Sequence, residues 1–163
     1  MKIQLHDNKK HLIFAPLTLT RPVGNLRVGI FTNDERWKIL LPSVEISFET
    51  EDYLSDKFPQ DSNAIVVNAC VIPTAEMVQE IIKLRGNEEL IYHETWLARS
   101  GTGEVIKKYK GNQPVVLNNR WDLYQKNAEI LELDFELVTK GRTSVQLSSS
   151  NTIIGDPNRI FLE

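Results

Sequence analysis

Apolar and polar residues alternate at two places near the start of the chain, from Ile3 to Asp7 and from Val44 to Phe48. A period of two is typical of a strand that buries one face. Residues 64–70 form instead a nearly continuous apolar run, which predicts a central strand covered on both faces. Further strands are expected at residues 89–93, 96–99, 135–139 and 145–147.

Helical periodicity or capping residues mark the segments between these strands. The clearest helix follows Pro73 and Thr74, where apolar residues 77, 78, 81 and 82 share one face. Another helix is expected to begin near Asn119 and to end before Asp134. Two shorter helices follow capping residues, over 33–41 with Asn33 as the cap and over 51–57 with Thr50 as the cap.

Strands that alternate with helices indicate an α/β domain with a mostly parallel mixed sheet and helices on both faces. Residues 12–30 contain two prolines and two glycines and have no helical period, which predicts a long ordered loop. Loops of this length in compact domains tend to carry function. The Gly101-Thr102-Gly103 segment is expected to form a hairpin turn.

Composition narrows the class of protein. The chain has 163 residues, a formal net charge of -3, one cysteine and three histidines. One cysteine excludes a disulfide framework, and the scattered histidines lack the spacing of a zinc site, so we expect a cytoplasmic protein. The mild acidity argues against nucleic acid as a partner, and no apolar stretch reaches the ~18 residues of a membrane span.

Several ordered motifs run through nearly the whole chain. The longest spans residues 16–30 and is followed by Glu35-Arg36-Trp37. The shorter motifs are Val67-Asn68-Ala69, Pro73-Thr74, Trp121-Asp122-Leu123-Tyr124 with Asn127, Asp134-Phe135, and residues 139–144 and 160–163. In these motifs the chain resembles the sugar-nucleotidyltransferase-like N-terminal domain of Bacteroidetes proteins similar to the bifunctional N-acetylglucosamine-1-phosphate uridylyltransferase/acetyltransferase.

The resemblance implies a Rossmann-like nucleotide-diphosphosugar transferase fold over residues 1–150. It implies that residues 151–163 begin a left-handed β-helix of an acyltransferase domain, because Ile154 and Ile160 stand one hexapeptide apart. In that family such a domain follows directly, and the full-length protein is expected to be a homotrimer. The implied reaction joins a nucleoside triphosphate to a sugar 1-phosphate with release of pyrophosphate, and Mg²⁺ is the implied cofactor. A nucleotide or sugar phosphate is the implied partner.

Four residues of the long loop are candidates for phosphate binding: Thr18, Thr20, Arg21 and Arg27. Two guanidinium groups and two hydroxyl groups can bind a diphosphate through charge-assisted hydrogen bonds. The alternative is structural, because the same arginines can tie an irregular loop to backbone carbonyls or to carboxylates.

Asn68 ends the predicted central strand, where ligands bind in open α/β sheets. It could bind a sugar or base, or satisfy backbone groups at the strand end. Asn118-Asn119-Arg120 resembles the Asn-Asn-Arg of uridylyltransferases, although Asn118 or Asn119 could equally cap the last helix. Asp122 and Trp121 belong to the resembling family's own motif, and Trp121 could pack in the core or stack on a nucleobase.

The chain departs from the wider superfamily directly after the first strand. Active members have a glycine-rich phosphate loop there, whereas this chain has Asp7-Asn8-Lys9-Lys10-His11 and no glycine before Gly24. Lys9 and Lys10 could contact phosphate or lie in a solvated turn. The sequence therefore leaves two functions open, a sugar nucleotidyltransferase and a catalytically degenerate domain that binds a nucleotide sugar or orients an acyltransferase.

Overall fold

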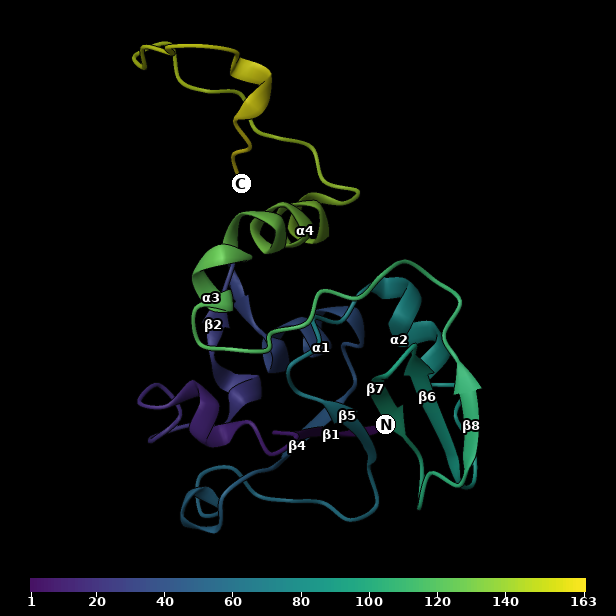
Figure 1. Ribbon diagram of the computed structural model, residues 1–163. Coiled ribbons are helices and arrows are strands. Elements are labelled where there is room, and N and C mark those ends of the chain that lie inside the picture. Colours follow the sequence, from purple (N-terminus) through teal and green to yellow (C-terminus); the bar gives the residue numbers. More distant parts are fainter.

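Six strands form one sheet in the order β4-β1-β5-β7-β6-β8 in the computed structural model, which describes residues 1–163 (Figure 1). Strand β1 is parallel to both neighbours, β6 is parallel to β8, and β7 is antiparallel to β5 and β6. The expected mostly parallel mixed sheet is confirmed. The strands are β1 (Lys2–His6), β4 (Glu45–Glu49), β5 (Ile65–Asn68), β6 (Glu88–Tyr92), β7 (Thr95–Arg99) and β8 (Val105–Lys108).

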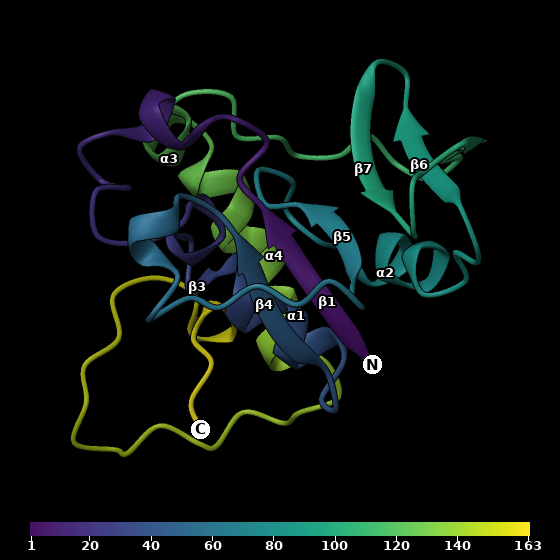
Figure 2. The ribbon, with the colours of Figure 1, turned by 90° about the horizontal axis from the view of Figure 1, so that it is seen from below.

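Helices cover the two faces of the sheet unequally. Helices α1 (Asn33–Leu40) and α2 (Ala75–Ile81) lie on one face, and α4 (Asn127–Thr139) lies beyond α1 (Figure 1). The opposite face is crossed by the segment after β4, which contains the single-turn 3-10 helix η3 (Asp52–Leu54) (Figure 2). The buried apolar side chains of β1, Ile3 and Leu5, belong to one core with the buried side chains of α1 and α2.

Residues 12–30 form the expected ordered loop, with turns of 3-10 helix at η1 (His11–Phe14) and η2 (Val23–Asn25). The loop ends in the two-stranded sheet of β2 (Arg27–Val28) and β3 (Phe31–Thr32). Close packing places η2 on the main sheet, because a Cβ at Gly24 would lie only 2.8 Å from the side chain of Leu5. The loop is therefore part of the core rather than a free surface segment.

A buried ion pair joins α1 to α4. The Arg36 Nε and Nη2 atoms donate to the Asp134 carboxylate at 2.7 and 2.6 Å, and both side chains are nearly inaccessible. The same carboxylate accepts the backbone N–H of Ile30 at 2.8 Å, and Asn127 accepts that of Gly29 at 2.8 Å. Through these bonds α4 fixes the end of the long loop.

The network continues from α1 to the central strand. Arg36 Nη1 donates to the side-chain oxygen of Asn33 at 3.0 Å. The Asn33 amide nitrogen in turn donates to the carbonyls of Ala69 and Val71, at 2.8 and 3.0 Å, directly after β5. One chain of hydrogen bonds thus connects α4, α1, the loop and the end of the central strand.

Asn33 therefore does not cap α1, as the sequence suggested. Thr32 is the cap: its hydroxyl accepts the Glu35 N–H, and the Glu35 carboxylate accepts the Thr32 N–H. Thr50 also caps no helix, because its hydroxyl donates to the carboxylate of Asp7 at 2.5 Å. In both cases the side chain that the local sequence predicted to be a helix cap forms hydrogen bonds with a distant part of the chain instead.

The C-terminal part of the chain differs most from the sequence prediction. Helix α4 runs through Asp134 to Thr139, so the strand expected at 135–139 is wrong, and residues 145–147 form no strand either. The predicted helix from Asn119 is divided at Lys126 into α3 (Asp122–Gln125) and α4. Helix α4 continues because the Asp134 side chain is satisfied by Arg36, which sequence periodicity cannot reveal.

Strand β8 was not predicted, and it changes the interpretation of the Gly101-Thr102-Gly103 turn. This turn leads from β7 to β8, but β6 lies between these two strands, and β8 pairs with the edge of β6 that faces away from β7. The segment is therefore a crossover turn rather than a hairpin between neighbouring strands.

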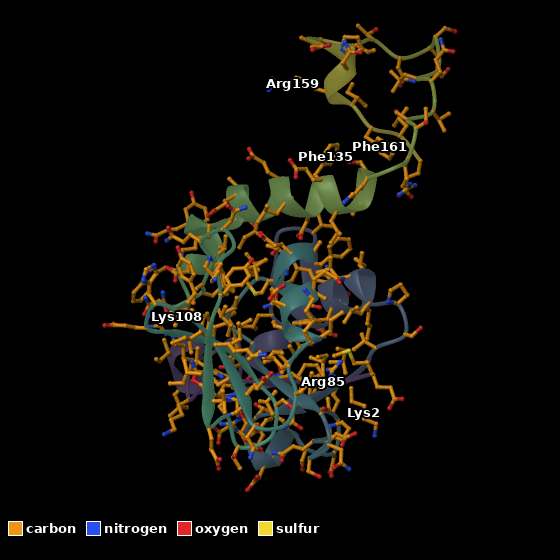
Figure 3. All side chains as sticks on the ribbon, turned by 90° about the vertical axis from the view of Figure 1, so that its right-hand side faces the viewer. Lys2, Arg85, Lys108, Phe135, Arg159 and Phe161 are labelled. Carbon is orange, nitrogen blue, oxygen red and sulfur yellow. The ribbon has the colours of Figure 1, made fainter.

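The segment after α4 extends away from the sheet and returns to α4 through one aromatic contact. The rings of Phe161 and Phe135 lie edge to face with centroids 6.3 Å apart (Figure 3). An ion pair between Arg142 and Glu163 at 2.8 Å accompanies this contact. The segment contains the single-turn η4 (Pro157–Arg159) and no strand, so the β-helix start at residues 151–163 stays a prediction.

Replacing Asp134 by Asn should destabilise the protein by about 3–5 kcal/mol, because it leaves the buried Arg36 charge without its counter-ion. Urea unfolding followed by circular dichroism measures the change. The matched control is Glu80→Gln, which neutralises the exposed pair with Lys83 and should cost at most about 1 kcal/mol. Equal losses in the two variants would contradict the assigned role of the buried pair.

Gly29→Ala should destabilise more than Gly141→Ala, although both glycines have a positive φ, of 66° and 73°. A left-handed backbone costs an L residue about 1–2 kcal/mol at either position. At Gly29 a Cβ would also lie 2.5 Å from Asp134 Oδ2, whereas at Gly141 nothing lies within 4 Å. Thermal unfolding of both variants tests this, and the same shift in both would argue against close packing at Gly29.

Candidate functional site

A cavity of about 910 Å³ opens at the carboxyl ends of β1 and β5. This is the edge at which open α/β sheets bind ligands, and the volume is within the usual range for small-molecule sites. Four parts of the chain form it: the turn after β1, the end of β5, the β6–β7 turn, and the segment leading to α4. The lining residues are Asn8, Lys10, Asn68, 92–96, Gln113, Pro114, Val116, Asn118 and Lys126.

The turn after β1 has an unusual backbone that aims Lys10 toward the cavity. Asn8 and Lys9 both have positive φ values, 50° and 58°, a conformation that glycine adopts most easily. The Asn8 N–H donates to His6 Nδ1 at 2.8 Å, which helps to hold the turn. Lys10 then donates to the side-chain oxygen of Asn118 at 2.7 Å. Lys10 is half-buried, and its hydrogen bond to Asn118 is exposed to solvent, so contact with phosphate stays a prediction.

Lys126 supplies a second ammonium group to the cavity from the junction of α3 and α4. Its Nζ atom donates to the backbone carbonyl of Val116 at 2.7 Å. Neither Lys10 nor Lys126 lies within ion-pair distance of a carboxylate, although ten other such pairs exist in the molecule. Two cations without counter-ions in one cavity favour an anionic ligand.

Asn68 lines the cavity, but its amide is already engaged by backbone. Its nitrogen donates to the Trp96 carbonyl at 2.9 Å, and its oxygen accepts the Cys70 N–H at 3.0 Å. The side chain is 4% exposed. It therefore holds the start of β7 against the end of β5, and it offers a ligand only its remaining hydrogen-bonding capacity.

Aromatic side chains also line the cavity. Tyr92 and Trp96 flank the β6–β7 turn, and His6 packs edge to face on Trp96 with ring centroids 5.6 Å apart. The indole N–H of Trp96 is buried and has no acceptor. The Arg99 guanidinium lies 5.7 Å from the centre of the Trp96 ring. A cavity that combines aromatic rings with ammonium groups suits a ligand that carries both a ring and phosphates.

Asp122 shapes the cavity without facing it. Its carboxylate accepts the backbone N–H groups of Asn118 and Asn119, at 2.5 and 3.2 Å. The prediction that one of these asparagines caps the helix is thus wrong. No side chain caps α3, and the Asp122 carboxylate instead accepts the N–H groups of the two asparagines. Trp121 is 54% exposed and does not line the cavity, so the core-packing alternative is wrong for this residue.

The four loop candidates do not converge on the cavity. Thr18 is fully buried and donates to the His11 carbonyl at 2.6 Å. Arg27 donates to the Ile30 carbonyl and to the Glu35 carboxylate. These are the contacts expected if Arg27 stabilises the loop rather than binds phosphate. Thr20 and Arg21 are exposed and make no side-chain hydrogen bond. The loop positions that looked suited to a diphosphate instead stabilise the loop or face solvent.

A buried polar cluster around Asp7 and His11 lies next to the turn after β1. Asp7 accepts hydrogen bonds from the Val23 N–H at 2.9 Å and from Thr50, and lies 3.2 Å from His11 Nδ1. His11 Nε2 lies 2.8 Å from the Tyr53 hydroxyl. Burial raises the pKa of Asp7 despite these hydrogen bonds. The cluster joins β1, the long loop and the segment after β4.

The donor set of the cavity does not fit a magnesium ion held by the protein. Mg²⁺ prefers carboxylate oxygens in near-octahedral geometry, and Glu94, which is exposed, is the single carboxylate of the lining. The Asp7 and Asp122 carboxylates are occupied by backbone and side-chain donors. No three His, Cys, Asp or Glu side chains are grouped so that they could bind a metal.

Sequence reasoning missed most of the cavity-lining residues. Lys10 is the exception: the sequence already offers it as a phosphate contact, because residues directly after the first strand face the ligand in α/β folds. Lys126 and the 92–96 turn gave no signal, since they depend on the break between α3 and α4 and on the antiparallel pairing of β7 with β5.

Fold and cavity together define an α/β domain with a cavity, lined by two lysines, at the ends of its parallel strands. Residues 3–143 match the sugar nucleotidyl transferase family, and the chain belongs to that family. No curated protein and no solved structure matches the chain. None of its helices has the length and apolar character needed to span a membrane.

Cys70 should be inert toward thiol reagents in the native protein. Cys70 follows the end of β5 and is fully buried. Burial raises the pKa of its thiol to about 12, so little of the reactive thiolate is present at neutral pH. Ellman's reagent at mildly alkaline pH should titrate no thiol in the native state and one thiol per chain in concentrated guanidinium chloride. Free glutathione serves as the positive control. Fast native reaction would mean that the segment after β5 opens readily.

Proposed function

We propose that this domain is a sugar nucleotidyltransferase that joins a nucleoside triphosphate to a sugar 1-phosphate and releases pyrophosphate. Family membership supports this class of reaction. The observation that carries the assignment to this cavity is the pair of ammonium groups, Lys10 and Lys126, which face it without counter-ions. Phosphate is the anion that the family's substrates share.

In this reaction a sugar-phosphate oxygen attacks the α-phosphorus. A new P–O bond forms, and the bond to the bridging oxygen of the β-phosphate breaks, so that pyrophosphate leaves with the electron pair. The chain's contribution is positioning and charge neutralisation, which dominate phosphoryl-type transfers. Lys10 and Lys126 would neutralise phosphate oxygens, while Tyr92 and Trp96 would contact the base or the sugar ring. An amino-sugar 1-phosphate is the acceptor that we favour from the resemblance.

A second candidate function is binding of a nucleotide sugar without transfer, and the composition of the cavity favours it. Its single carboxylate, Glu94, is exposed, and the turn after β1 lacks the glycines of an active phosphate loop. In this case the domain would sense or present a nucleotide sugar to an attached acyltransferase. Its placement before a trimeric β-helix domain, and its location in the cytoplasm, remain predictions from the resemblance and the composition.

Pyrophosphate release separates the two candidates. The purified chain should release pyrophosphate from one of the common nucleoside triphosphates in the presence of an amino-sugar 1-phosphate or hexose 1-phosphate, measured by a coupled phosphate assay. Lys10→Met should lower kcat/KM about tenfold or more, since a charge-assisted hydrogen bond contributes about 1.5–3 kcal/mol. Lys9→Met, in the same turn but outside the lining, is the matched control.

Unchanged circular dichroism and thermal unfolding would show that both variants remain folded. Absence of turnover with every pair of substrates, together with binding of a nucleotide sugar, would select the second candidate. Equal loss of activity in the two lysine variants would contradict the assignment of the reaction to this cavity.

A further inference from the structure

The two ammonium groups of the cavity are held by neutral oxygens. Lys10 donates to an amide oxygen of Asn118, and Lys126 donates to the Val116 carbonyl, each at 2.7 Å. These contacts orient both cations but leave their charges uncompensated. Each ammonium has further N–H donors for a ligand.

The surrounding carboxylates cannot supply a metal site of their own. Asp122 is 6% exposed and its Oδ2 atom accepts two backbone N–H groups. Asp7 is 4% exposed and is bonded to a backbone N–H and the Thr50 hydroxyl. Asn68 uses both ends of its amide on backbone. The positive charge of this cavity therefore comes from its lysines.

We propose that the cavity binds the diphosphate of a nucleotide sugar without a divalent cation held by the protein. The inference rests on the proposed function, because it concerns the same site and the same class of ligand. Lys10 and Lys126 take over the neutralisation that a bound metal ion would otherwise provide. The protein thus recognises a nucleotide sugar as a metal-free dianion.

Charge matching supports a nucleotide sugar over a free triphosphate as the metal-free ligand. Each phosphodiester group carries about one negative charge, so the diphosphate of a nucleotide sugar carries about two. The two ammonium groups match that charge, and the single carboxylate of the lining, Glu94, is exposed to solvent. A terminal phosphate carries a charge of about -1.5 to -2, so a free triphosphate would leave about two negative charges without a cationic partner in the cavity.

Calorimetric titration in EDTA and in Mg²⁺ buffer tests the inference. The probes are UDP-N-acetylglucosamine, ADP-glucose, GDP-mannose and dTDP-glucose, each compared with its own nucleoside triphosphate. The Kd of the nucleotide sugar that binds should agree within about threefold between the two buffers. In EDTA the corresponding triphosphate should bind about tenfold more weakly, a difference of about 1.4 kcal/mol.

Lysine variants connect the result to this cavity. Lys10→Met and Lys126→Met should each weaken nucleotide-sugar binding about tenfold or more in both buffers, and Lys9→Met should leave it unchanged. Lys126→Gln, which keeps a donor for the Val116 carbonyl, controls for a purely structural effect at that position. If Lys126→Gln restored full affinity, the charge of Lys126 would have no role and the inference would fail.

The outcomes separate this inference from the proposed function. A nucleotide sugar that binds in Mg²⁺ buffer but loses tenfold or more of its affinity in EDTA overturns the inference and leaves the proposed function standing. Absence of binding by every probe in both buffers contradicts both. Binding could also be equal in the two buffers but unaffected by the Lys10 and Lys126 variants. That result would show that the nucleotide sugar binds outside this cavity, and it would overturn the inference.

Discussion

The buried ion pair between Arg36 and Asp134 is the interaction on which the rest of the structure depends. A guanidinium group removed from water requires compensation at each of its donors. Here Asp134, Asn33 and the Val28 carbonyl provide it. Because these partners belong to α4, α1 and the long loop, none of the three elements can take its position alone. The loop that crosses the core is ordered only when the helix from the far end of the chain is in place.

The residues of this hydrogen-bond network differ from the residues that line the cavity. Arg36, Asn127 and Asp134, which lie in the sequence motifs described above, build the framework. Among the motif residues Asn68 lines the cavity, whereas Lys10 and Lys126 line it from outside the motifs. Several motif residues in this chain thus join elements of the fold. The same conclusion applies to Arg27, which looked suited to phosphate and forms an exposed pair with Glu35.

Local pattern was sufficient for five of the six strands of the main sheet and insufficient for the site. Strands β1, β4, β5, β6 and β7 and helix α2 follow from alternation, apolar runs and the Thr74 cap, because burial on one or both faces dictates their sequences. The extension of α4 and the pairing of β8 depend on contacts between distant residues. Among the site candidates, Asn68 lines the cavity from the end of β5, a position that the apolar run predicts, and Asn118 lines it from the segment before α3. Lys126 required the break before α4.

The turn after β1 contains no glycine, but two of its residues have the backbone conformation that glycine adopts most easily. Asn8 and Lys9 adopt left-handed conformations that cost L residues conformational energy, and the buried Asp7 cluster beneath them holds the turn in that shape. The side chains of this turn thus lie where a glycine-rich loop would offer only backbone N–H groups. In the binding site that we propose, ammonium groups take the place of those backbone dipoles. A site of that kind responds to the ionic strength of its surroundings, because long-range charge attraction is screened by salt while short contacts with backbone amides are far less so.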